Sequence, residues 1–151
     1  TGELKQQKLE ALFTEIVDTD WIGRFVVGAS WRRMSAEQQR DYLDTYRRFL
    51  VKHYTSNFRE YTEGTTFKVT KARPIGSKNQ FLVSVAIIRT ANPQPVNIDY
   101  RLRELEKGGF RAIDIVVEGV SLLATQRSEF SSVIQRDGLE KLISLLKKKA
   151  A

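Results

Sequence analysis

Cysteine is absent from this 151-residue sequence, and histidine occurs once, as His53. Without cysteine the chain has no disulfide, no thiolate metal site and no cysteine nucleophile. A single histidine cannot supply a His-rich zinc site or a facial-triad iron site, and any histidine-based triad would need His53. The sequence contains no glycine-rich phosphate-binding motif, and its one glycine pair, Gly108 and Gly109, is typical of a turn. We therefore expect no metal site and no resident cofactor.

The sequence also has few prolines, three in all, and no apolar run approaching the about 18 residues that cross a membrane. Apolar residues make up 41% and charged residues 28%, which is typical of a globular protein and not of a disordered one. At roughly 100–200 residues per domain, the length predicts that residues 1–151 form a single domain.

Acidic residues are missing from one segment of a chain whose net charge is +7. Between Gly64 and Ile98 no acid accompanies the five cations, which are Lys68, Lys71, Arg73, Lys78 and Arg89. A positive local field of this kind attracts phosphate-bearing molecules or acidic protein surfaces, although a plain solvated surface has the same composition.

Apolar spacing predicts three helices in the first part of the chain. The first covers residues 4–17, and a short, almost entirely apolar second helix covers residues 21–27 after a cap at Asp18 or Thr19. Ser35 and Gln38 have the spacing of a capping box, which opens a long aromatic helix over residues 35–58.

The apolar period then changes to two, which predicts strands over residues 67–75, 81–88, 96–103 and 110–118. In the last strand Ile113, Ile115 and Val117 are expected on one face, with Ala112 and Asp114 on the other. Two closing helices follow, over residues 121–135 and after an Asp137-x-x-Glu140 cap. The predicted fold is α+β in the order ααα-ββββ-αα, with helices on one face of a curved antiparallel sheet, in a nuclear-transport-factor-like outline.

Enzyme chemistry finds little support in these elements. Asp114 and Glu118 share strand parity and lie about 13 Å apart, too far for the carboxylate pair of a retaining glycosidase. We expect Asp114 on the solvent face or paired with an arginine of the neighbouring strand. Phe67 and Tyr100 share faces with aliphatic residues, so the sheet does not predict a nucleic-acid platform. The predicted elements carry more apolar side chains than the packing of helices on four strands requires. These side chains either fill a large core or enclose an apolar ligand, and their composition is the same in both cases.

Several segments together resemble the MlaC family, also called toluene-tolerance auxiliary proteins, over about residues 15–146. Residues 114–123 (DIVVEGVSLL), 126–130 (QRSEF) and 136–139 (RDGL) resemble its strand-to-helix junction. Residues 25–32 (FVVGASWR), 49–54 (FLVKHY) and 100–102 (YRL) agree with three further elements. One departure is Gln126, which stands where the family often has tyrosine and puts a ligand contact of that tyrosine in doubt.

The resemblance implies a periplasmic carrier, not an enzyme, that holds a glycerophospholipid as cargo between helices and sheet. Its partners would be an outer-membrane lipoprotein complex and an inner-membrane ABC transporter complex, in a system that maintains outer-membrane lipid asymmetry. Membrane contact would be transient and through these partners, and nucleic acid would not bind. Because such carriers are exported and this sequence opens on polar residues, we expect it to be the mature form.

The site residues expected on this interpretation form two groups. The first would line an apolar lipid cavity and comprises Ile22, Phe25, Val26, Phe49, Tyr54, Phe67, Val69, Val83, Val85, Ile98, Tyr100, Leu102, Val117, Val120 and Leu122. The second would dock to acidic partner surfaces and comprises Lys68, Lys71, Arg73, Lys78, Arg89, Arg101 and Arg103.

Two other functions share the predicted outline. A cone-shaped isomerase or dehydratase would need a polar acid–base pair at the floor of its pocket, where we predict an apolar floor. An interaction module would have a solid core and no bound lipid.

Overall fold

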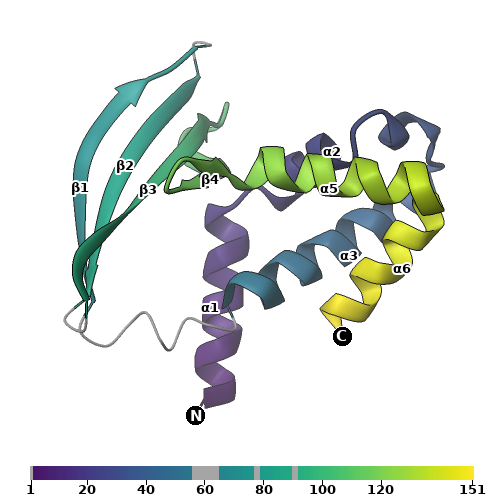
Figure 1. The fold of residues 1–151 in the computed structure, drawn as a ribbon, viewed down its shortest axis with the longest axis horizontal. Helices are drawn as coiled ribbons and strands as arrows, with labels where there is room; N and C mark the ends of the chain where they lie inside the picture. The colour runs from purple at the N-terminus through teal and green to yellow at the C-terminus, as the bar shows by residue number, and fades with distance from the viewer. Residues whose placement is uncertain (1, 56–64, 77–78, 90–91) are drawn as a thin grey trace.

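The computed structural model describes residues 2–55, 65–76, 79–89 and 92–151 (Figure 1). Within these residues the α+β class and the order of helices, strands and helices are confirmed. The helical half comprises α1 (Gly2–Ile16), α2 (Thr19–Val27), a 3₁₀ segment (Gly28–Arg33) and α3 (Ala36–Thr55). The remainder comprises β1 (Thr65–Pro74), β2 (Gln80–Arg89), β3 (Asn92–Glu104), β4 (Phe110–Val117), β5 (Val120–Ser121), α5 (Leu122–Asp137) and α6 (Leu139–Ala150).

The strands form one antiparallel sheet in the order β1-β2-β3-β4-β5, and its curvature is visible in Figure 1. A register shift in β4 places Ala112 opposite Leu102, while Ile115 lies opposite Tyr100. The additional residue keeps Ala112 on the face of Ile115 and Val117, so the prediction that Ala112 shares a face with Asp114 is wrong. A bulge of this kind reverses the alternation, and apolar spacing alone does not reveal it.

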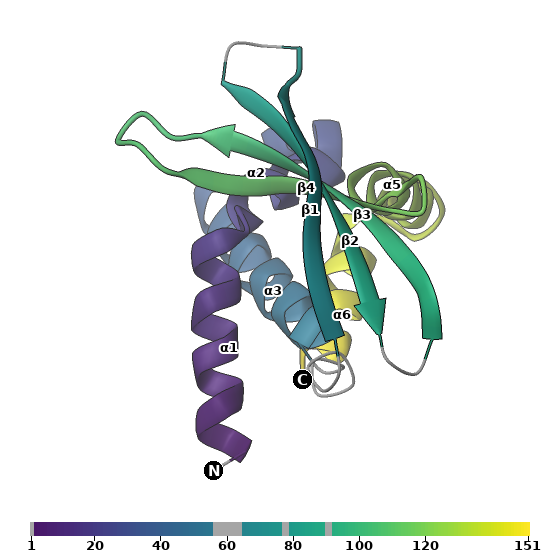
Figure 2. The same ribbon diagram turned by 90° about the vertical axis from the view of Figure 1, so that its left-hand side faces the viewer.

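The helices meet the sheet mainly at β4 and β5, and β1 to β3 extend away from the helices (Figures 1 and 2). Contacts with β4 come from α1, α2 and α5. Val17 adds a parallel bridge to Ala112, and the Asp18 N–H donates to the Ala112 carbonyl at 2.9 Å. The helical layer is therefore attached along one side of the sheet.

Two of the predicted helix caps are confirmed. The Asp18 carboxylate accepts from the Trp21 N–H at 3.2 Å at the start of α2. Before α3, the Gln38 N–H donates to the Ser35 hydroxyl at 3.2 Å and the Ser35 N–H donates to the Gln38 side chain at 2.9 Å. The predicted end of this helix at residue 58 lies outside the described residues.

The cap predicted at Asp137 is wrong. Helix α5 continues through Asp137, and α6 follows Gly138 without a side-chain cap. Gly138 has a φ of 92°, which glycine adopts readily. The conformational freedom of glycine therefore separates these two helices, and Asp137 pairs instead with Arg136 at 3.1 Å.

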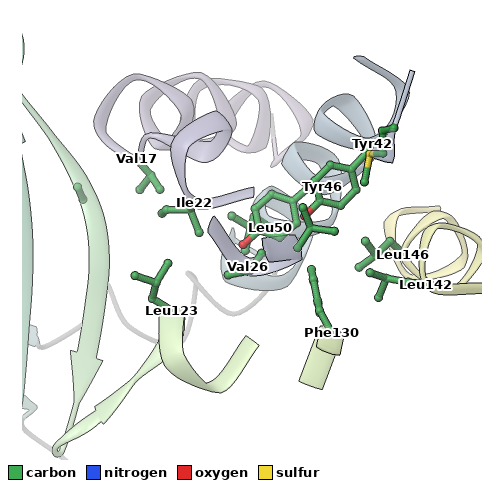
Figure 3. Packing of buried hydrophobic residues seen from close by; sticks show 13 residues of the cluster. Val17, Ile22, Val26, Tyr42, Tyr46, Leu50, Leu123, Phe130, Leu142 and Leu146 are labelled. Atoms are coloured by element: carbon green, nitrogen blue, oxygen red, sulfur yellow. The ribbon is translucent and has the colours of Figure 1, made fainter. Parts of the chain in front are cut away.

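The hydrophobic core lies among the helices (Figure 3). Ile22 and Val26 of α2 face Tyr42, Tyr46 and Leu50 of α3, and Phe130, Leu142 and Leu146 complete the cluster. Helices α2 and α3 approach closely at Gly23, whose carbonyl accepts from the Tyr42 hydroxyl at 2.6 Å. A Cβ at Gly23 would lie 2.9 Å from a ring carbon of Tyr46, so only glycine permits this approach.

A partly buried ion pair joins the helices to the sheet. Asp18, at the turn between α1 and α2, is 4% exposed. Its carboxylate accepts from Arg103 of β3 at 2.6 Å and lies 3.7 Å from an Arg111 nitrogen. Arg111 also donates to the Thr14 carbonyl at 2.6 Å. These contacts give Arg103 a structural partner inside the protein.

We expect Asp18→Ala to lower the free energy of unfolding by about 2–4 kcal/mol, because the substitution removes the cap of α2 and the charge-assisted hydrogen bond from the partly exposed Arg103. Urea denaturation of the purified proteins measures the change. Asp20→Ala is the matched control, since Asp20 is exposed in the first turn of α2 and contributes at most about 1 kcal/mol through the helix dipole. Equal effects of the two substitutions would contradict the assignment.

Candidate functional site

One face of the sheet carries a continuous set of apolar side chains. Cross-strand pairing joins Val69 to Val85, Val85 to Ile98, and Ile98 to Val117 in one row. The next row joins Val83 to Tyr100, and Val120 pairs with Val117 at the edge. We call this surface the apolar face and define it by Val69, Val83, Val85, Ile98, Tyr100, Leu102, Val117 and Val120.

The apolar face is only partly covered by the described residues. Val69 is 63% exposed, Val117 42% and Val120 61%, while the other members are half-buried. Burial raises the pKa of the Tyr100 hydroxyl. Contiguous apolar surface in contact with water favours an apolar ligand or partner, because covering the surface removes it from solvent.

The remaining predicted lining residues lie among the helices. Ile22 and Val26 are each 1% exposed and belong to the hydrophobic core. Phe25 is half-buried between the Trp21 ring, with centroids 5.6 Å apart, and the Arg127 guanidinium, 4.7 Å from the Phe25 centroid. The side chain of Phe67 lies outside the described residues. Alternation of apolar residues did not distinguish this core from the apolar face.

A pocket of about 570 Å³ brings together three other predicted residues, Phe49 and Tyr54 of α3 and Leu122 of α5. His53 packs there, with its ring 5.8 Å from Phe49 and 4.9 Å from Tyr54. We call it the α3–α5 pocket; it is also lined by Lys52, Thr125, Gln126, Glu129 and Lys149. Its walls therefore combine apolar rings with a charged rim, an arrangement suited to an amphipathic ligand.

Asp114 anchors the start of α5 to the sheet. It is 6% exposed, and its carboxylate accepts from the Leu123 N–H at 3.0 Å and the Ser121 hydroxyl at 2.6 Å. The expectation that Asp114 lies on the solvent face is wrong. The strand register does place it opposite Arg101 of β3, but its carboxylate bonds to the N-terminus of α5, which supplies donors and a favourable dipole. Both oxygens accept hydrogen bonds, so this carboxylate is not placed as a general base.

The predicted docking residues are distributed between exposed and structural positions. Lys68, Lys71 and Arg73 are exposed on β1, where they pair with Ala86, Ser84 and Leu82. These pairings place them on the sheet face opposite the apolar face, after a register shift between Val69 and Lys71. No ion pair joins these three cations to any residue that the structure describes. We call them the β1 cations.

The other four docking candidates have different surroundings. Arg101 is half-buried and donates to the Gln80 side chain at 2.8 Å, and Arg103 is held by Asp18. Lys78 and the side chain of Arg89 lie outside the described residues. The β1 cations are therefore the members of this set that the structure shows on an open surface.

Gln126 has a structural role that its sequence context did not reveal. Its side chain is 5% exposed and accepts a hydrogen bond from the Tyr46 hydroxyl. Buried polar groups need such partners, and among the described residues Gln126 is the hydrogen-bond partner of the Tyr46 hydroxyl. No pattern in the sequence links positions 46 and 126, which lie on different helices.

The described residues contain no candidate for a metal centre or for a membrane-spanning helix. No three histidine, aspartate or glutamate side chains gather there in an arrangement that could hold a metal ion. In the same part of the chain, no helix combines the length and the apolar composition needed to cross a bilayer.

The chain is similar to several known proteins. The family model described as MlaC protein matches residues 2–148. The curated "Intermembrane phospholipid transport system binding protein MlaC" of Haemophilus influenzae is 22% identical over 136 residues, which cover 89% of this chain and 63% of that protein. The chain thus spans less than two thirds of this relative's length.

A solved structure of similar fold comes from Ralstonia solanacearum, a phospholipid-binding protein in complex with a phospholipid. The TM-score is 0.81 at 22% sequence identity, and the match covers 96% of this chain and 82% of the other. At this identity the likeness establishes a shared fold.

We expect the stability of the protein to fall as the pH rises from about 10 to about 12, in part because of Tyr54. Burial, followed by the charges of Asp114 and Glu129, raises the pKa of Tyr54 to about 12. A raised pKa favours the neutral phenol in the folded state, so this contribution is complete below the unfolded pKa of about 10 and is lost as the pH approaches 12.

Urea denaturation of the wild type and Tyr54→Phe across this range tests the expectation. The variant should lose less stability, because phenylalanine does not ionise. Burial raises the pKa of Tyr42 in both proteins, so its contribution cancels in the comparison. The charge of Tyr54 is one cause of the raised pKa of Tyr46, so the Tyr46 contribution also falls in the variant and changes the profile in the same direction. Parallel pH profiles would show that Tyr54 does not contribute.

Proposed function

This chain belongs to the MlaC family, and on that basis we propose that it carries a glycerophospholipid non-covalently, with the acyl chains held against its apolar face. The observation that carries this proposal is the partial exposure of that face, including Val69 at 63%. The Ralstonia solanacearum protein, which shares the fold, was solved with a phospholipid. Its complex supports a lipid as the occupant in this chain.

The energetics of acyl-chain burial are sufficient for such a complex. Each methylene removed from water is worth about 0.8 kcal/mol, and a nanomolar complex needs about 12 kcal/mol. Two acyl chains supply more than this before the costs of ordering and desolvation are subtracted. No covalent bond is needed, and cargo held by hydrophobic contact alone can be released to a partner.

We propose that the α3–α5 pocket continues the lipid site from the sheet into the helices. Leu122 directly follows β5, where Val120 pairs with Val117 of the apolar face. Phe49 and Tyr54 line the same pocket as Leu122. In this arrangement Ile22 and Val26 support the site from the core, and the residues in contact with lipid are those of the apolar face and the pocket.

The same residues favour a carrier over an enzyme. Asp114, the acid that interrupts the apolar β4 strand, has its oxygens occupied by Ser121 and the α5 backbone. A dehydratase or isomerase would need such a group facing its substrate. We propose that residues 1–151 form a single lipid-binding domain that performs no chemistry on its cargo and uses no cofactor.

We further propose that the protein acts in the periplasm, between an outer-membrane lipoprotein complex and an inner-membrane ABC transporter complex. Its relative is named for intermembrane phospholipid transport. The β1 cations, which form no ion pair with any described residue, offer a positive surface for acidic regions of these complexes. Membrane contact would then occur through the partners.

Val85→Glu should abolish lipid retention, because the substitution places an unpaired charge among the acyl chains. The test is solvent extraction of the purified protein and mass spectrometry of the extract. Wild type should yield glycerophospholipid in amounts comparable to the protein. The Val85→Glu variant should yield at least tenfold less glycerophospholipid, which is equivalent to about 1.4 kcal/mol of binding free energy.

Ser84→Glu is the matched control. Ser84 is the adjacent residue of β2, lies on the opposite face and pairs with Lys71, which can neutralise the new carboxylate. This variant should keep its lipid. Normal loading of a folded Val85→Glu variant would remove this position from the site, and an empty wild-type extract from a lipid-rich host would contradict the carrier function.

Lys71→Glu combined with Arg73→Glu should slow lipid transfer roughly tenfold at low salt, because electrostatic attraction increases the rate of encounter. Transfer is measured between the loaded protein and vesicles that contain the partner complexes, and lipid content should be unchanged. Lys8→Glu with Lys141→Glu makes the same change in net charge on exposed helical positions. Equal transfer rates for the two double variants would reject the β1 cations as the docking surface.

A further inference from the structure

The apolar face ends in an aromatic pair at one end of the sheet. Phe81 of β2 and Phe110 of β4 meet edge to face, with ring centroids 5.4 Å apart and an interplanar angle of 86°. Phe81 lies opposite Leu102, and Leu102 lies opposite Ala112. Phe110 is two residues from Ala112 on the same strand, so all four side chains lie on the side of the sheet that carries the apolar face, with Ala112 buried in the core.

Polar residues and turns lie beyond this pair. Phe110 pairs with the exposed Glu104, and β2 begins at Gln80 after Asn79. The Glu104 N–H donates to the Asn79 carbonyl at 2.8 Å, and the Leu105 N–H donates to Gly109 at 2.9 Å. Backbone hydrogen bonds therefore fasten the strand ends here, and the two rings stand on a fixed framework.

The length of the apolar face matches that of a membrane acyl chain. Four residues separate Val85 from Phe81 on β2, and four separate Ile98 from Leu102 on β3. At about 3.4 Å per residue, each stretch measures about 14 Å. The hydrocarbon core of a bilayer is about 30 Å thick, so the chains of one leaflet extend over about 15 Å. A chain that lies along the strands from the Val85–Ile98 row would thus end at the aromatic pair.

We propose that Phe81 and Phe110 form an end wall that sets the acyl-chain length of the cargo. This inference rests on the proposed function. Phe110 is 51% exposed, so its ring is available for contact with a ligand. Methylenes that extend past the wall meet the polar strand ends. Each one that leaves the interior of a bilayer and is exposed to water there lowers the affinity for the bilayer lipid roughly fourfold relative to a buried methylene. The wall makes phospholipids with longer chains weaker ligands.

A competition experiment tests the end wall. The delipidated full chain is incubated with an equimolar mixture of phosphatidylcholines that differ only in acyl-chain length, and the bound lipid is extracted and measured by mass spectrometry. Wild type should discriminate against the longest chains. Phe110→Ala, alone and with Phe81→Ala, should enrich them severalfold, because the wall is removed.

Val83→Phe is the converse variant, because Val83 lies one step closer to the Val85–Ile98 row on the same face. This change should move the wall inward and shift the bound population towards shorter chains. Leu12→Ala serves as the matched control, since Leu12 is also 51% exposed but lies on α1. The chain-length profile of this control should equal that of wild type.

The outcomes separate the two proposals. If Phe110→Ala and Val83→Phe bind lipid with the wild-type profile, the end wall is rejected and the carrier function stands. If the delipidated wild type binds none of the phosphatidylcholines, the carrier function itself fails. The Phe110→Ala and Val83→Phe variants decide the matter even if the double alanine variant does not fold, because each changes one partly exposed side chain.

Discussion

The buried carboxylate of Asp18 connects the two halves of this protein. It caps α2, accepts a hydrogen bond from Arg103 of β3 and lies beside Arg111 of β4. The backbone N–H of Asp18 also donates to the Ala112 carbonyl of β4. An ion in this position requires partners from helix and sheet together, because an unpaired buried charge is strongly destabilising. Asp114 makes a second connection a short distance along the same strand, between β4 and α5.

Attachment at β4 explains why the protein can have both a solid core and an open apolar surface. The core is formed by α2, α3, α5 and α6, which pack on one another through residues such as Tyr46 and Leu146. The outer strands do not complete this core, so their apolar side chains remain partly exposed. A protein that buried them under its own helices would have no surface for a hydrocarbon ligand.

Local rules predicted most of the fold. Helix periodicity, the Ser35–Gln38 capping box and strict alternation in β3 each depend on neighbouring residues, and they gave the α+β class and the element order. The site was less accessible, because core and ligand surface share one composition: Ile22 proved to be core while Val85 lies on the apolar face. The β4 bulge, the Asp114 cap and the Tyr46–Gln126 bond depend on contacts distant in sequence, which no local pattern encodes.

The irregular strand β1 affects how separate molecules of this protein can associate. Strand β1 pairs with β2 on one side only among the described strands, and an open strand edge invites pairing with another copy. Its register shift after Val69 interrupts regular hydrogen bonding, and the β1 cations repel the same strand of a second molecule. Irregularity and like charge together oppose edge-to-edge polymerisation, which would otherwise join the exposed valines of successive molecules into one extended sheet.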